Sequence, residues 1–335
     1  MEQRALGKTG LSVSALGFGC GAVGGLLVRG VHTEQTAAIA QAMDAGITYF
    51  DTAPSYGDGR SEENLGRVLR DLGAWRDVVV GTKVRLHPSD LDDPAAAIRR
   101  SCEASLLRLG HDSVDLLQLH NPIAESREAA ALVSGSSQAL AADIVHGPVA
   151  DGMRELVSRG LVRHIGITGL GQTAAVHATV ASGAFATTQA YFNALNPSGG
   201  YPGAGGGEQD FAGLIGMAAA SGMGVIAIRV MAAGALSAQE TRHANAGDPG
   251  PQLATGAEFE RDVERAAAIR RLAVDMGYDG PMELALRFAL ATPGISTVLV
   301  GYSDRPQLED ALKWTERGPV PKDVTARVVE LARAS

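Results

Sequence analysis

Short apolar runs alternate with longer amphipathic segments through most of this 335-residue chain. The runs are rich in Val, Ile and Leu, which is typical of strands buried on both faces. We predict eight strands, at residues 15–18, 47–50, 78–83, 113–119, 162–167, 187–189, 224–228 and 297–300. A predicted helix follows each strand, at 33–45, 61–72, 94–109, 148–159, 172–182, 208–221, 281–291 and 304–316. This alternation indicates a parallel sheet, and eight units are the number in a (β/α)8 barrel.

Three segments lie outside this repeat. Residues 3–14 contain two strand-like pieces around Gly7-Lys8-Thr9-Gly10, a pattern that predicts a β-hairpin. Residues 258–276 and 322–334 have helical periodicity and are predicted accessory helices. We therefore expect one α/β domain over residues 1–335, a (β/α)8 TIM barrel with an N-terminal hairpin and accessory helices.

Three connections are unusually long or rich in glycine. Residues 121–147 and 237–257 exceed ordinary connections, so we expect them to cover the carboxyl-end face of the barrel. Residues 196–207, with the sequence NPSGGYPGAGGG, also belong to that face. Their glycines suit a closing flap and a disordered stretch equally well.

Composition and charge narrow the class of protein. The net charge of -8 argues against a surface that binds nucleic acid. The sequence contains no block of Lys and Arg that would indicate binding to an anionic membrane. Two cysteines, Cys20 and Cys102, give no disulfide framework, and no signal peptide or long apolar helix is present. These features predict a reduced, cytoplasmic protein; the sequence does not indicate an oligomeric state.

Ionisable side chains stand at the ends of three successive predicted strands. Asp51 follows 47–50 with Tyr56 in the next turn, Lys83 ends 78–83, and His120 follows 113–119. In a barrel these ends face the reaction site, and a lysine at the end of a buried strand requires a partner. Taken singly, the four could be a turn cap, a surface aromatic, a solvent-directed lysine and a core histidine. Their shared position instead indicates one site.

The four residues and the sequence around them resemble the aldo-keto reductase family. The clearest segment is GITYFDTAPSYGDGRSEENLG, at residues 46–66, and the similarity extends over nearly the whole chain. The resemblance implies an NAD(P)-dependent oxidoreductase that transfers hydride between nicotinamide and a carbonyl or alcohol group. Within the family the chain is most similar to sugar dehydrogenases, which implies an aldose or a small aldehyde as substrate.

The chemistry of carbonyl reduction suits these side chains. Addition of hydride to a carbonyl carbon creates an alkoxide, which needs a proton donor. Tyr56 would donate the proton, and an ammonium about 4 Å away at an effective dielectric near 20 is worth about 4 kcal/mol, or roughly three pKa units. Lys83 would supply that charge and Asp51 would hold it in place. His120 would donate to the substrate oxygen, and the substrate would contact Tyr56, His120 and Asn121.

The resemblance also assigns residues to the nicotinamide end of the cofactor. Thr168-Gly169 stands where the family has a Ser-Asn pair for the carboxamide, so the hydroxyl is kept and the amide is lost. Gln189 matches the family's glutamine at the same group. Ile228 replaces a stacking aromatic, and Arg229 could reach a pyrophosphate oxygen or form a structural ion pair.

The last predicted strand leads into a helix N-terminus that would hold the rest of the cofactor. The candidates in this loop are Gly301, Ser303, Asp304, Gln307 and Asp310. NADP-preferring members have a lysine and an arginine where this chain has Gly301 and Gln307. Asp304 would accept from ribose hydroxyls and repel a 2′-phosphate, so NAD is favoured, while Arg305 keeps NADP possible.

A glycine-rich segment near the N-terminus needs a separate assignment. Residues 19–24 match GxGxxG, but no helix is predicted before about Thr33, whereas a Rossmann loop must lead directly into one. We therefore do not predict a Rossmann fold, although Gly21 is assigned to the cofactor site.

Two alternatives belong to other functional classes. One is a regulatory or sensor protein that binds nicotinamide with negligible turnover, which the intact set of four residues disfavours. The other is a metal-dependent barrel hydrolase. The eight histidines form no HxH or HExxH pattern, so we expect no metal site.

Overall fold

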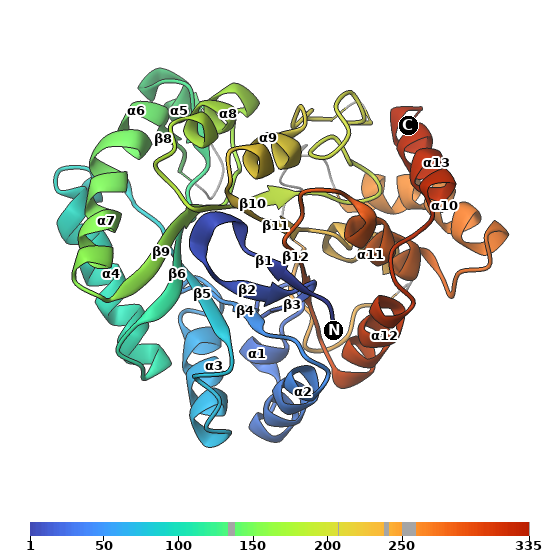
Figure 1. Cartoon of the computed structure of the whole chain (residues 1–335), viewed down its shortest axis with the longest axis horizontal. Coiled ribbons are helices and arrows are strands. Elements are labelled where there is room, and N and C mark those ends of the chain that lie inside the picture. Colours follow the sequence, from blue (N-terminus) through green and yellow to red (C-terminus); the bar gives the residue numbers. More distant parts are fainter. Residues whose placement is uncertain (133–137, 207, 238–240, 250–258, 335) are drawn as a thin grey trace.

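Eight parallel strands close into a barrel in the computed structural model, which describes residues 1–335 except 133–137, 207, 238–240, 250–258 and 335 (Figure 1). Around the ring the order is β10, β11, β12, β3, β4, β5, β6, β9. The strands are β3 Leu16–Gly19, β4 Tyr49–Asp51, β5 Val79–Val84, β6 Val114–Leu119, β9 Val162–Ile167, β10 Thr187–Tyr191, β11 Gly224–Ile228 and β12 Thr297–Gly301. The predicted (β/α)8 fold is therefore confirmed.

Helices surround the ring and follow the strands as predicted. They are α2 His32–Asp44, α3 Arg60–Asp71, α4 Pro94–Leu109, α7 Ala150–Ser158, α8 Thr173–Ala181, α9 Leu214–Ala220, α11 Pro281–Ala291 and α12 Arg305–Glu316. α4 shows the local signals clearly, because Asp93 caps its first turn and Gly110 ends it in a left-handed conformation. α9 begins later than the predicted 208–221, because Ala212 and Gly213 both have positive φ.

The N-terminal hairpin closes the amino end of the barrel. It consists of β1 Gln3–Ala5 and β2 Ser12–Ser14, joined through a 3-10 turn at Gly7–Thr9. Leu6, Leu11 and Val13 pack against the inward residues of four barrel strands, Tyr49, Val79, Leu116 and Ile226. Gly7 lies so close to Gly224 that a Cβ would come 2.2 Å from its nitrogen. With this end filled, the carboxyl ends of the strands are left for a functional site.

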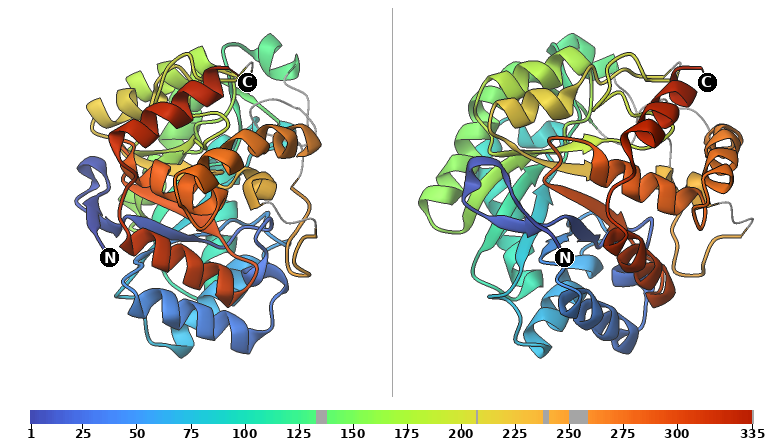
Figure 2. Two further views of the ribbon diagram at one scale, coloured as in Figure 1. Left: turned by 90° about the vertical axis from the view of Figure 1, so that its right-hand side faces the viewer. Right: turned by 45° about the vertical axis from the view of Figure 1, so that its right-hand side comes forward.

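The two accessory helices occur where they were predicted. They are α10 Phe259–Asp275 and α13 Lys322–Arg333, and they lie together outside the ring beside α11. Figure 2 shows the hairpin at one end of the barrel, with α5 and residues 241–249 at the opposite end. The long connections therefore gather at the carboxyl-end face, as expected.

Two of the three connections are more structured than predicted. Residues 121–147 contain β7 Ile123–Ala124, α5 Arg127–Leu132, β8 Leu140–Ala141 and α6 Ala142–Ile144, and a π-helical turn at Val145–Val149 then leads into α7. Residues 196–206 are folded against α11, where the ring of Tyr201 lies 5.8 Å from that of Phe288. Over the residues that the structure describes, the segment is therefore folded rather than disordered; residue 207 lies outside them.

Candidate active site

Asp51, the last residue of β4, accepts hydrogen bonds from four buried side chains. Its Oδ1 pairs with the ammonium of Lys83. Its Oδ2 accepts from the hydroxyl of Tyr49 at 3.0 Å and from the amides of Gln118 and Gln189 at 2.9 Å each. The strands β4, β5, β6 and β10 all contribute to this cluster, so the carboxylate lies near the axis of the barrel. Its charge is fully compensated.

Lys83 has its charged end fixed between Asp51 and Tyr56. Only 1% of its side chain is exposed, and Nζ also donates to the carbonyl of Thr52 at 2.8 Å. Nζ lies 4.8 Å from the centroid of the Tyr56 ring. Burial alone would lower the pKa of the lysine, but Asp51 and the Tyr56 phenol outweigh it and the pKa is raised. The lysine therefore stays charged, and it has the partner that its buried position requires.

Tyr56 and His120 lie side by side above this pair. Their rings meet edge to face with centroids 6.0 Å apart. The turn that carries Tyr56 contains Gly57 and Gly59, both with positive φ, and a Cβ on Gly57 would come 2.4 Å from Val28. Burial, followed by the charges of Lys83 and Arg85, holds the pKa of His120 well below its usual value. His120 is thus a neutral imidazole that can donate one hydrogen bond and accept another.

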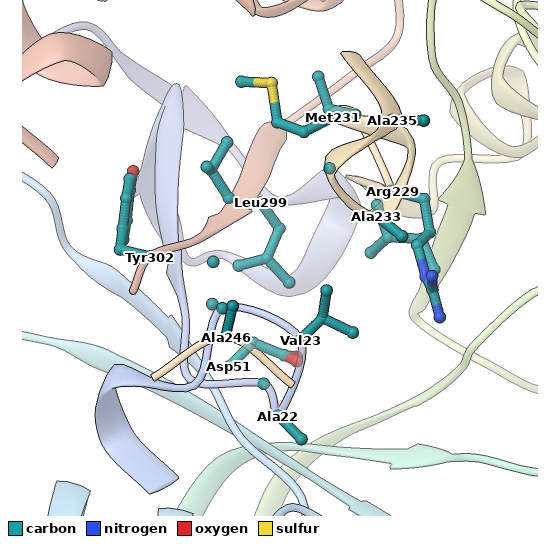
Figure 3. Close-up of a pocket in the computed structure, with 18 of the residues that line it drawn as sticks. Ala22, Val23, Asp51, Arg229, Met231, Ala233, Ala235, Ala246, Leu299 and Tyr302 are labelled. Atoms are coloured by element: carbon teal, nitrogen blue, oxygen red, sulfur yellow. The ribbon is translucent and has the colours of Figure 1, made fainter. Parts of the chain in front are cut away.

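A cleft of about 1550 Å³ opens from these residues toward α12. Most of the residues predicted for the site line it: Gly21, Asp51, Tyr56, His120, Thr168, Gln189, Ile228, Arg229, Gly301, Ser303, Gln307 and Asp310. Figure 3 shows Leu299 and Val23 projecting into the cavity, with Arg229 and Ala233 on one side and Tyr302 on the other. Lys83 lies beneath the floor, in contact with Asp51.

Asn121 does not line the cleft, contrary to the prediction that it binds substrate. Its Oδ1 accepts from the backbone nitrogen of Leu86 at 2.9 Å. Its Nδ2 donates to the carbonyls of Leu86 and Gln138 at 2.8 and 2.9 Å. Because both ends of the amide are bound to backbone, Asn121 fastens the long connection after β6 to the end of β5.

Thr168 and Gln189 offer a donor and an acceptor that suit a carboxamide. Thr168 Oγ1 is buried without a hydrogen-bond partner among the described residues. Gln189 Nε2 is bound to Asp51, which leaves its Oε1 as the free end of the amide. The pairing of Ile167 with Thr188 places Thr168 beside Gln189. Gly169 has no room for a side chain, because a Cβ there would lie 2.1 Å from the Gln189 carbonyl.

The end of β11 adds an apolar and a cationic surface. Ile228 packs beside Leu299 at the top of the inner core of the barrel. Arg229 follows in a left-handed conformation with φ of 61°, and its Nη1 donates to the carbonyl of Pro249 at 3.3 Å. Burial lowers the pKa of this arginine. No carboxylate of the described residues forms an ion pair with Arg229, so the predicted alternative of a structural ion pair is not observed there.

The loop after β12 differs from the prediction at Asp304. Its carboxylate caps α12 by accepting from the nitrogen of Gln307 at 3.0 Å, and the residue does not line the cleft. Arg305 also points away, since it donates to Gln41 and lies near Glu309. Gln307 accepts from the nitrogen of Ser303 at 2.9 Å and lines the cleft. The side chains of Asp304 and Arg305 are therefore used inside the protein.

Residues 241–249 form a strap across the cleft. Asn245 donates to the carbonyl of Ser303 at 3.0 Å, and the nitrogen of Gly247 donates to Val23 at 3.0 Å. Arg29 donates to the carbonyl of Asn245 at 2.6 Å. These bonds join the loop after β3 to the loop after β12. The predicted covering role of 237–257 holds for this part; 238–240 and 250–257 lie outside the described residues.

The GxGxxG segment closes the loop after β3. A Cβ at Gly24 would lie 2.6 Å from the nitrogen of Tyr302, and one at Gly25 would lie 1.8 Å from the carbonyl of Asn245. A single helical turn, α1 Leu26–Arg29, follows, whereas no helix was predicted before about Thr33. The closed barrel confirms that the fold is not of the Rossmann type, and Gly24 and the adjacent Gly25 are required for close packing of loops.

Sequence reasoning missed three polar residues of the site: Tyr49, Gln118 and Arg85. Each stands two residues from a predicted site residue on the same strand or its end, namely Asp51, His120 and Lys83. Side chains two apart on a strand point to the same face, so this spacing was an available signal. Within the described residues, no group of three or more His, Cys, Asp or Glu could hold a metal ion. None of the described helices is long and apolar enough to cross a membrane.

Comparisons with known proteins agree with this geometry. Residues 15–333 match the aldo/keto reductase family. L-galactose dehydrogenase of Arabidopsis thaliana is 29% identical over 92% of this chain and 86% of its own length. D-threo-aldose 1-dehydrogenase of a Pseudomonas species is 38% identical over 35% of this chain and 43% of its own length. The structure of aldo-keto reductase AKR11C1 from Bacillus halodurans, 23% identical, shares the fold with a TM-score of 0.73 over 100% of this chain and 97% of that one. The chain therefore belongs to the aldo/keto reductase family and is a nicotinamide-dependent oxidoreductase that acts on carbonyl or alcohol groups.

Proposed function

We propose that this protein interconverts an aldose, or a small aldehyde, with its oxidised or reduced counterpart, and that NAD is its favoured cofactor. The observation that carries the proposal is the charged Lys83 held between Asp51 and Tyr56, next to a neutral His120. The names of two relatives, L-galactose dehydrogenase and D-threo-aldose 1-dehydrogenase, support an aldose as the substrate.

Tyr56 is the proposed proton donor and acceptor. In reduction its phenol gives a proton to the substrate oxygen, and in oxidation the phenolate takes a proton from the substrate hydroxyl. The ammonium of Lys83 stabilises the phenolate, since it is buried and lies 4.8 Å from the ring centroid. Acid–base assistance of this kind contributes roughly 10²–10⁴-fold, so correct placement of the substrate must supply much of the remainder.

His120 is the proposed hydrogen-bond donor to the same substrate oxygen. Because its pKa is held low, the imidazole is neutral near pH 7 and does not compete with Tyr56 as an acid. Asp51 keeps Lys83 in place, and Tyr49, Gln118 and Gln189 fix Asp51. We therefore assign Asp51 a positioning role.

The cofactor would lie along the cleft between β9 and α12. When bound, the nicotinamide supplies or accepts the hydride. The free hydroxyl of Thr168 and the free Oε1 of Gln189 would hold its carboxamide, and Ile228 with Leu299 would pack against the ring. Arg229 would reach the pyrophosphate.

The charge around α12 favours NAD over NADP. Gly301, Gln307 and Asp310 face the cleft and carry no positive charge, and Arg305 turns toward α2 and Glu309. A 2′-phosphate placed beside Gly301, Gln307 and Asp310 would receive no cation from these three residues and would lie near the carboxylate of Asp310. The proposed preference for NAD therefore depends on Gly301, Gln307 and Asp310 and not on Asp304.

Steady-state turnover by the Tyr56→Phe variant tests the function. Formation or loss of NADH is followed with a panel of aldoses and aldehydes, and with NADP in parallel. We expect Tyr56→Phe to lower kcat by about 10²-fold or more, while the affinity for NADH, measured by fluorescence, is kept. Tyr278→Phe removes a phenol outside the cleft and serves as the matched control. A parent protein that binds NADH but turns over none of the panel would support the regulatory alternative instead.

A further inference from the structure

Arg85 brings an uncompensated charge to the substrate end of the cleft. It directly follows β5, two residues after Lys83, and lines the cleft with Tyr56 and His120. The side chain is partly buried, and its Nε is buried without an acceptor. No hydrogen bond or ion pair joins Arg85 to any residue that the structure describes. The Nε of this guanidinium has therefore lost water without gaining a protein partner.

The acidic groups of the cleft cannot compensate this charge. Among the described lining residues the carboxylates are Asp51 and Asp310. Asp51 is already paired with Lys83, and Asp310 lies on α12, which follows β12 rather than β5. Burial lowers the pKa of Arg85, and only the Tyr56 phenol opposes this effect. The substrate end of the cleft is therefore a site of positive potential in a chain whose net charge is -8.

The order of the strands separates Arg85 from the other cationic side of the cleft. In the ring β10, β11, β12, β3, β4, β5, β6, β9, the strand β5 stands opposite β11, which leads into Arg229. Arg229 and Arg242 each donate to a backbone carbonyl and lie on the side proposed for the cofactor. Arg85 instead stands beside Tyr56 and His120, and its charge contributes to the low pKa of His120. A ligand of Arg85 would thus be part of the substrate.

We propose that Arg85 binds a carboxylate or phosphate group of the substrate, so that the enzyme acts on an anionic sugar or aldehyde. A guanidinium presents several N–H donors in a planar fork that matches either group. This inference rests on the proposed function and names its substrate class. The reaction itself is unchanged, since oxidation of the substrate still removes one hydride and one proton.

Matched neutral and anionic substrates test the proposal. One set is galactose, galacturonate and galactose 6-phosphate, and the other is butanal and succinate semialdehyde. We expect the parent to favour an anionic member by about tenfold or more in kcat/KM, mainly through a lower KM. Arg85→Gln should lower kcat/KM for that member about tenfold more than for its neutral counterpart, and Arg85→Lys should lie in between. Comparing the effect of Arg85→Gln on galacturonate and succinate semialdehyde with its effect on galactose 6-phosphate shows whether Arg85 binds a carboxylate or a phosphate.

Arg76→Gln is the matched control, because it makes the same change of charge at the amino end of β5, where Arg76 is exposed. It should behave like the parent with every substrate. Equal losses on neutral and anionic substrates in Arg85→Gln, or a parent that prefers the neutral members, would overturn the assignment.

A binding measurement separates this proposal from the proposed function. Galacturonate, galactose 6-phosphate and succinate are titrated calorimetrically into the complex of the protein with NADH, for the parent and for Arg85→Gln. We expect at least one of these anions to bind the parent about tenfold more tightly than the variant. If no substrate is turned over, the proposed function fails, but this difference would still support the anion site. Equal binding to both proteins, or none to either, would refute the site.

Discussion

Gln189 reaches across the barrel to Asp51, with its Nε2 2.9 Å from Oδ2, although β10 and β4 stand on opposite sides of the ring. The contact is possible because both side chains point from their strands toward the axis of the barrel. It ties the proposed carboxamide site to the carboxylate that holds Lys83. A change at Gln189 should therefore affect both stability and turnover.

Gln189→Glu should destabilise the protein at neutral pH. The substitution places a second carboxylate against Asp51, which we expect to cost about 1–3 kcal/mol in the free energy of unfolding. The pKa of the new carboxyl would be raised above its unfolded value, so its protonation as pH falls should restore part of the loss. Urea unfolding at several pH values measures this, with Gln189→Leu as the uncharged control. A loss in Gln189→Glu that does not shrink relative to Gln189→Leu at low pH would contradict the prediction.

The strands and helices could be predicted because their signals are local. Apolar runs such as 78–83 mark buried strands. Asp51, Lys83 and His120 stand at the ends of such strands, and Tyr56 lies in the turn that follows the first of them. The cross-barrel bonds could not be predicted in the same way. Tyr49 and Gln118 are polar residues within strands, and their role depends on the closure of the ring, which no short segment of sequence encodes.

Asp304 and Asn121 show how local and distant interactions compete for one side chain. Asp304 precedes Arg305 and Pro306, and an acidic residue before a proline in the first helical turn is a helix-capping signal. The resemblance to the family assigned it to ribose, and the cap uses its carboxylate instead. Asn121 follows a site histidine, but its amide binds the backbone of two other segments. These bonds depend on the path of the connection after β6, which brings the carbonyl of Gln138 back to Asn121.

Protonation of His120 should destabilise the folded state. Its folded pKa is lower than that of the unfolded chain, so below about pH 6.5 the unfolded state binds a proton that the folded state does not. Stability should fall with falling pH by up to about 1.4 kcal/mol per unit until the folded pKa is reached. The difference in unfolding free energy between the parent and His120→Gln, measured from pH 7 downward, isolates this effect from that of other histidines. A difference that stays constant with pH would show that His120 titrates normally.

Lys83→Met alone should lower the free energy of unfolding more than Lys83→Met combined with Asp51→Asn, which removes both charges of the ion pair. The variant leaves the buried Asp51 carboxylate without its cation, which we expect to cost about 3–5 kcal/mol. Adding Asp51→Asn removes the stranded charge, so the double variant should recover part of the stability while activity stays low. Unfolding by urea and turnover by absorbance give the two readouts. A double variant less stable than Lys83→Met would contradict this prediction. It would mean that the hydrogen bonds to Asp51 contribute more to the free energy of unfolding than its unpaired charge costs.

A change of two residues near α12 should move the cofactor preference toward NADP. A Cβ on Gly301 would lie no closer than 3.4 Å to its nearest neighbour, so Gly301→Lys fits without moving the backbone. Gln307→Arg gives up the bond to Ser303 and brings a second cation to the cleft. Together they should raise the ratio of kcat/KM for NADP to that for NAD by about tenfold or more.

Arg305→Gln is the control for this change. The side chain of Arg305 is bound to Gln41, so the ratio should stay at the parent value. If the parent already prefers NADP, or if Arg305→Gln abolishes its use, a cation other than those at 301 and 307 binds the phosphate.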